Sequence, residues 1–80
     1  MPVTVKIDVM LKDEILDPQG QALERSLPQL GFQGVGSVRV GKHIEMVLDD
    51  GVDLEARVEE MADRLFANPV VETFTYRVER

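Results

Sequence analysis

The segment from Gly36 to His43, with the sequence GSVRVGKH, resembles a phosphate-binding loop. That motif has two glycines with four residues between them, then Lys and a hydroxyl residue, with a strand before it and a helix after it. Here His43 takes the place of the hydroxyl residue that would hold Mg²⁺. Polar and apolar residues alternate on both sides of Gly41, which is typical of strands rather than of a helix. We therefore expect a tight turn of a hairpin at Gly41 and Lys42, with no bound nucleotide.

His43 and Glu45 form a second candidate for chemistry, because residues two apart on a strand point to the same face. Acid–base catalysis would also need a pocket and a third group to orient the pair, so we interpret them as an exposed polar pair. The chain has no cysteine and a single histidine, which excludes thiolate and histidine-rich metal sites. The sequence therefore predicts no catalytic, cofactor-binding or metal-binding residues in this chain.

The composition also limits the possible partners. The formal net charge is −6 and the nine basic residues are scattered, whereas nucleic-acid binding needs clustered cations. No segment approaches the ~20 apolar residues of a membrane span, and the amino terminus does not resemble a signal peptide. We expect a cytoplasmic protein whose partners are other proteins or small molecules, with no nucleic acid and no membrane.

Six segments have the periodicity of regular structure. Alternation predicts strands over residues 3–11, 37–40, 44–48 and 70–78. Helical spacing places Ala22, Leu23, Leu27 and Leu30 on one face, between a cap at Asp17 and a C-terminal glycine at Gly31. A second helix is predicted from Leu54, Val58, Met61 and Leu65, with Asp53 as its cap and Asn68-Pro69 as its stop.

The order βαββαβ predicts an α+β, ferredoxin-like fold over residues 1–80 as a single domain. In that two-layer sandwich, two helices cover one face of a four-stranded antiparallel sheet, and the last strand lies at an edge. A chain of 80 residues builds only a thin core, and small domains compensate by oligomerising when disulfides and metals are absent. We expect a dimer or tetramer formed through the sheet or its strand edges.

Two features are not explained by folding alone, whereas a third is. Gly20 lies in the first turn of a helix, where glycine costs about 1 kcal/mol relative to alanine. Either another backbone or a bound group approaches it closely, or it is merely tolerated. Arg39 and Lys42 place two cations around one turn of an acidic protein, either as a solvated hairpin or as a surface for an acidic partner. Asn68-Pro69 needs no function beyond ending a helix.

The blocks LDPQG, VRVGK and ANPVVE, in this order, resemble the PurS family, the small subunit of phosphoribosylformylglycinamidine (FGAM) synthase. This resemblance covers the whole chain. It implies a non-catalytic subunit that bridges a glutamine amidotransferase subunit and a synthetase subunit in de novo purine biosynthesis and supports ammonia transfer. ATP and Mg²⁺ would be used by the synthetase subunit, to convert formylglycinamide ribonucleotide to its amidine.

The residues that carry the resemblance are the candidates for partner contacts or turns, and for none of them does the family imply catalysis. They are Asp17, Pro18, Gly20, Arg39, Gly41, Lys42, Asn68 and Pro69. The main alternative is a small oligomeric, ferredoxin-like regulatory domain that binds an effector. An independent enzyme would need a catalytic pocket that the sequence does not indicate.

Overall fold

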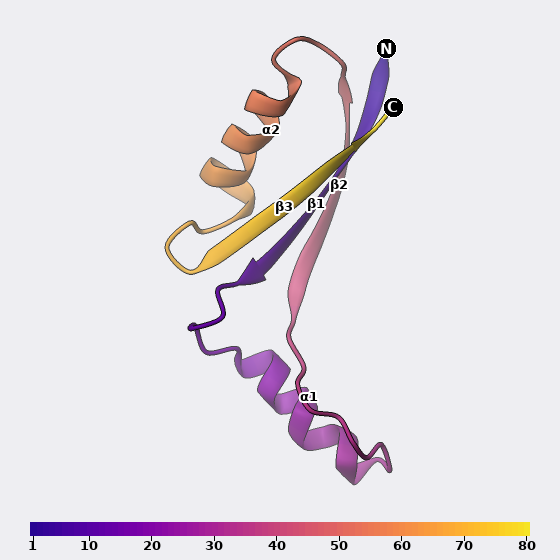
Figure 1. Cartoon of the computed structure of the whole chain (residues 1–80), viewed down its shortest axis with the longest axis vertical. Coiled ribbons are helices and arrows are strands. Elements are labelled where there is room, and N and C mark those ends of the chain that lie inside the picture. Colours follow the sequence, from indigo (N-terminus) through magenta and orange to yellow (C-terminus); the bar gives the residue numbers. More distant parts are fainter.

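The computed structural model describes residues 1–80 as one three-stranded antiparallel sheet, two α-helices and a π-helical turn (Figure 1). In chain order these are β1 (Pro2–Leu11), α1 (Pro18–Gln29), β2 (Gly41–Asp49), α2 (Leu54–Met61), the π-helical turn Ala62–Phe66 and β3 (Glu72–Glu79). The strand order is β2-β1-β3, so β1 is central and both other strands are edges. The α+β class and the edge position of the last strand agree with the prediction.

The alternation of β1 places four branched aliphatic side chains in the core: Val3, Val5, Ile7 and Val9, each at most 4% exposed. Because β1 pairs with both neighbours, each of these residues has cross-strand partners on the same face. Ile7, for example, lies opposite Ile44 of β2 and Tyr76 of β3. β1 therefore supplies most of the apolar surface that the rest of the domain covers.

α2 covers this apolar face of the sheet (Figure 1), and Leu54, Val58 and Ala62 are fully buried against it. The sequence also predicts Leu65 on the buried face of this helix. That prediction is wrong, because the Leu65 side chain is 77% exposed. A hydrogen bond from the Ala67 amide to the Ala62 carbonyl, five residues back, widens the last turn into a π-helix. This widening rotates Leu65 outward and brings Phe66 and Ala67 onto the core instead.

The predicted four-stranded sheet is wrong, because residues 37–40 are not a strand. They run extended beside α1, and side-chain carboxylates take the place of a neighbouring strand. The Val38 amide donates to Glu24 Oε1 at 2.7 Å and the Val40 amide to Asp17 Oδ2 at 2.8 Å. With these amides bound to the helix, the segment has no ladder with the sheet.

The prediction of two helices on one face of the sheet is also wrong. α1 projects from the end of the sheet (Figure 1), and none of its residues belongs to the core cluster. The molecule is accordingly elongated, with extents of 50 × 26 × 14 Å. We call residues 12–40, which comprise α1 and the segments on both sides of it, the arm.

Both ends of α1 have the capping residues that the sequence predicts. Asp17 caps the first turn, and Gly31 adopts a positive φ of 95° after the last one. The Gly31 and Phe32 amides donate to the Pro28 and Leu27 carbonyls, which is the hydrogen-bond pattern of a Schellman cap. Pro28 lies in the last turn, where it has no N–H to donate to the Glu24 carbonyl.

Which side of α2 and of the π-helical turn is buried can be tested by replacing leucine with alanine at two positions. Leu54→Ala should lower the free energy of unfolding by about 2–5 kcal/mol, because it leaves a cavity against β1. Leu65→Ala should change it by less than about 0.5 kcal/mol, because this leucine is exposed. Urea unfolding followed by circular dichroism measures both. A large effect of Leu65→Ala would contradict the π-helical turn.

Candidate functional site

The three sequence blocks that carried the family resemblance lie together at one end of the sheet. There β1 ends, β2 and β3 begin, and the chain enters and leaves the arm (Figure 1). Met10 lies opposite Gly41, Leu11 lies opposite Glu72, and the Lys12 amide donates to the Val71 carbonyl. An open hollow of about 490 Å³ occurs here, and its walls are Leu11, Asp17, Pro18, Gln19, Val40, Gly41, Lys42 and Glu72.

Asp17 fixes the arm with both oxygens of one carboxylate. Oδ1 accepts a hydrogen bond from the Gly20 amide at 2.9 Å, and Oδ2 accepts one from the Val40 amide at 2.8 Å. These two hydrogen bonds hold the pKa of Asp17 below its ordinary value of 3.8, because they stabilise the charged form. Asp17 is thus both the helix cap that the sequence predicts and a link between α1 and the segment before β2.

Gly20 is the only buried residue of α1. A Cβ at this position would overlap the Val38 carbonyl oxygen and the Asp17 carboxylate. The close approach of another backbone, one of the explanations left open by the sequence, is therefore the reason for glycine in this first helical turn.

Gly41 is the first residue of β2 and has no positive φ, so the predicted hairpin turn at Gly41-Lys42 is wrong. A Cβ on Gly41 would meet the Val9 carbonyl oxygen and the Met10 sulfur. Glycine is needed here because the end of β1 passes close to it. β2, rather than a helix, follows Lys42, as the alternation in the sequence predicts.

Arg39 and Lys42 have different roles in the structure. The Arg39 guanidinium donates to the Leu11 carbonyl and pairs with Asp13 at 3.0 Å, so it ties the arm to the end of β1. Lys42 has no hydrogen-bond or ion-pair partner and lines the hollow. Of the two cations, Lys42 is the one whose charge is available to a partner.

Asn68 and Pro69 form the turn that leads into β3. The Asn68 carbonyl accepts from the amides of Val71 and Glu72, and its side chain accepts from the Val70 amide at 3.1 Å. The Glu72 carboxylate in turn accepts from the Asn68 amide at 2.6 Å. These bonds agree with a turn role for Asn68-Pro69 and delay the strand, so that Val70, predicted to face inward, is exposed.

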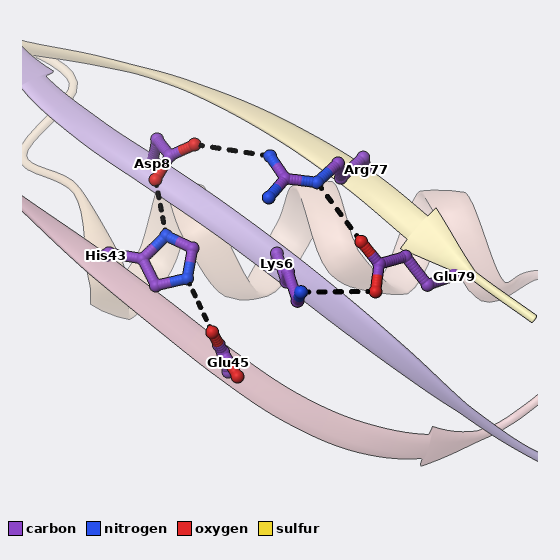
Figure 2. Close-up of polar contacts among 6 residues, drawn as sticks. All are labelled: Lys6, Asp8, His43, Glu45, Arg77 and Glu79. Atoms are coloured by element: carbon purple, nitrogen blue, oxygen red, sulfur yellow. Dashed lines mark hydrogen bonds and ion pairs between the residues drawn. The ribbon is translucent and has the colours of Figure 1, made fainter.

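Sequence reasoning missed Glu24, which binds the Val38 amide from the middle of α1. A single glutamate on a helix surface gives no signal of such a role. Reasoning from the sequence also missed the polar network on the uncovered face of the sheet, where the His43–Glu45 pair is extended by charged residues of β1 and β3 (Figure 2). No group of three His, Cys, Asp or Glu side chains is arranged to hold a metal ion, and no helix is long and apolar enough to cross a membrane.

Comparison with known proteins agrees with the resemblance seen in the sequence. Residues 4–80 match the family model for PurS, described as phosphoribosylformylglycinamidine (FGAM) synthase. The chain is 41% identical over 76 residues to the PurS subunit of that synthase from Bacillus subtilis (strain 168), covering 94% of this chain and 90% of that protein.

Two solved structures extend this likeness to the fold. B. subtilis PurS superposes with a TM-score of 0.91 and 39% identity over 98% of this chain and 99% of that one. A chain in the structure of PurLQS from Thermotoga maritima superposes with a TM-score of 0.85 and 29% identity over 98% of both chains.

Replacing Asp17 with asparagine should loosen the arm. An amide nitrogen cannot accept the second backbone hydrogen bond, so α1 amides should lose protection in hydrogen exchange at neutral pH. The stabilisation by Asp17 is present above pH 3.8 and is lost as the pH falls through the lowered folded pKa. The helical signal of the wild type should therefore approach that of Asp17→Asn in acid.

Glu14→Gln is the matched control, because Glu14 is exposed and has no polar partner. It should leave the protection of α1 unchanged. Equal protection of α1 in the wild type and in Asp17→Asn at neutral pH would show that the carboxylate does not hold the arm.

Proposed function

The chain belongs to the PurS family, the PurS subunits of FGAM synthase in purine biosynthesis, and from this we propose a bridging role for it. In this proposal it joins a glutamine amidotransferase subunit to an ATP-dependent synthetase subunit. Ammonia released from glutamine by the first subunit then reaches the second, which uses ATP and Mg²⁺ to convert formylglycinamide ribonucleotide to formylglycinamidine ribonucleotide. The chain itself supplies positioning rather than catalysis.

The observation that carries the bridging role is the gathering of the LDPQG, VRVGK and ANPVVE blocks at one end of the sheet. Most of their polar groups fix the backbone there: Asp17 binds two amides, Arg39 binds Asp13 and Leu11, and Asn68 forms the turn. A rigid end of this kind, with the unpaired Lys42 in its hollow, suits docking to another protein. The solved PurLQS assembly from T. maritima, which contains a chain of this fold, supports such a complex.

We also propose that the chain associates with itself as a dimer or tetramer. Large apolar side chains are exposed along the arm, and none of them belongs to the core cluster: Leu16, Leu23, Leu30, Phe32 and Val35. Both edge strands are open as well, as the strand-edge interface expected from the sequence requires. A second copy that covers the arm would supply the apolar burial that the thin core lacks.

The effector-binding alternative has less support. Such a site needs a concave pocket in which polar groups converge, whereas the hollow at the end of the sheet is open and both of its carboxylates, Asp17 and Glu72, bind the chain's own backbone. A small molecule that raises the melting temperature of the isolated chain would favour this alternative.

The bridging role is tested by reconstituting the enzyme from purified synthetase and amidotransferase subunits with and without this chain. Amidine formation with glutamine should require the chain, because ammonia must pass between subunits. Amidine formation with an ammonium salt should continue without it, because free ammonia reaches the synthetase from solution. If neither activity responds to the chain, the bridging role is wrong.

Lys42→Glu refines this assay. It should raise the concentration of chain needed for half-maximal glutamine-dependent activity, and the effect should weaken with added salt. Arg57→Glu is a matched control, because Arg57 is an exposed, unpaired cation on α2, away from both the hollow and the arm. An equal effect of both variants would assign the loss to net charge rather than to the hollow.

Self-association through the arm predicts that Leu30→Ser combined with Phe32→Ser lowers the molar mass measured by light scattering. These side chains are 72% and 59% exposed, so their replacement should leave the fold of the sheet intact. Val52→Ser, a fully exposed position after β2, is the control and should keep the mass of the wild type. An unchanged mass of the arm variant would exclude the arm as the interface.

A further inference from the structure

The face of the sheet opposite α2 carries a network of alternating charges (Figure 2). Asp8 of β1 lies directly opposite His43 of β2, and the His43 Nδ1 to Asp8 Oδ1 distance is 2.5 Å. On the other side of β1, the Arg77 guanidinium of β3 lies 3.8 Å from Asp8 Oδ2. The same central carboxylate thus faces one cation on each edge strand.

His43 also contacts a second carboxylate, because its Nε2 lies 2.8 Å from Glu45 Oε2. A neutral imidazole has only one N–H, so one ring nitrogen would then turn a lone pair toward a carboxylate oxygen. The imidazolium form donates from both nitrogens and satisfies both acceptors. The geometry therefore selects the charged ring, and the hydrogen bonds to Asp8 and Glu45 raise the pKa of His43 above 6.5.

The charged groups around His43 on this face balance only when its ring is protonated. From β1 these are Lys6 and Asp8, from β2 Glu45, and from β3 Arg77 and Glu79, with Lys6 and Arg77 both bound to Glu79. No helix covers this face, since α2 packs on the other one. Loss of the His43 proton leaves the group with one uncompensated negative charge between β1 and β2.

The two edge strands differ in how they are tied to β1. β3 is tied by Arg77 to Asp8 and by Lys6 to Glu79. Arginine and lysine side chains in general titrate well above histidine. His43–Asp8 is the one polar side-chain contact that joins β2 to β1. It lies two residues from Gly41, at the end of β2 that forms the hollow.

We propose that the His43–Asp8 pair is a pH-sensitive contact between strands, which holds β2 and its Gly41–Lys42 end against β1 when the His43 ring is protonated. The Arg77–Asp8 pair, which contains no histidine, holds β3. The folded state binds the proton more tightly than the unfolded chain does, so this contact contributes its full stabilisation below pH 6.5. The contact is lost as the pH rises through the folded pKa of His43, and the amides of β2 then become less protected from hydrogen exchange than those of β3.

The first test is an NMR titration of His43, whose ring signals are unambiguous because the chain has a single histidine. The midpoint in the folded protein should lie above that of the same chain unfolded in urea. Asp8→Asn and Glu45→Gln should each lower the folded midpoint. Asp63→Asn, on the opposite side of the sheet, should not. Equal folded and unfolded midpoints would overturn the proposal.

The second test compares hydrogen exchange of the amides that β2 and β3 bond to β1. The ratio of β2 to β3 protection cancels the common effect of pH on chemical exchange. From below pH 6.5 to above the measured midpoint, this ratio should fall about two- to fivefold, the range expected of one exposed ion pair. His43→Arg should keep the ratio constant with pH, and His43→Gln should keep it low throughout. A constant ratio in the wild type, or the same fall in His43→Arg, would overturn the proposal.

Discussion

The structure depends on a single strand. β1 pairs with both edge strands and packs against α2, so its inward side chains take part in every layer of the domain. Only nine of the 80 residues are buried, and four of them belong to β1. In so thin a core the hydrophobic stabilisation is concentrated on few side chains, and a change at Val5 or Ile7 acts on two strand pairings and one helix contact together.

The arm is held by a different kind of interaction. Because α1 buries almost nothing against the sheet, its position is set by charge-assisted hydrogen bonds from backbone amides to Asp17 and Glu24. These bonds satisfy the extended segment before β2 without adding it to the sheet. They also leave the apolar side chains of the arm uncovered.

The two faces of the sheet serve different purposes. The face under α2 is apolar and stabilises the fold, whereas the open face pairs its own charges across three strands (Figure 2). β2 connects this open face to the hollow beside α1. Gly41 and Lys42 line the hollow, and His43, the next residue of the strand, lies on the open face. The hollow and the charged groups of the open face are therefore linked through consecutive residues of one strand.

Much of the local structure was determined by the sequence. The alternation of residues 3–11 predicted β1, Asp17 and Gly31 predicted the ends of α1, and the spacing of Leu54 and Val58 predicted the buried face of α2. The family followed from three short blocks whose residues are needed where backbones approach closely, as at Gly20. Such signals are local, since each depends on a few neighbouring residues.

What the sequence did not determine was which of its segments would meet. Residues 37–40 have the pattern of a strand, but the carboxylates of Asp17 and Glu24 compete for their amides, and no local pattern reports the outcome of that competition. The outward turn of Leu65 depends on a π-helical bond formed as Ala67 packs on the core. The His43 network needed the register of three strands. Only the tertiary structure decided these, because each depends on groups far apart along the chain.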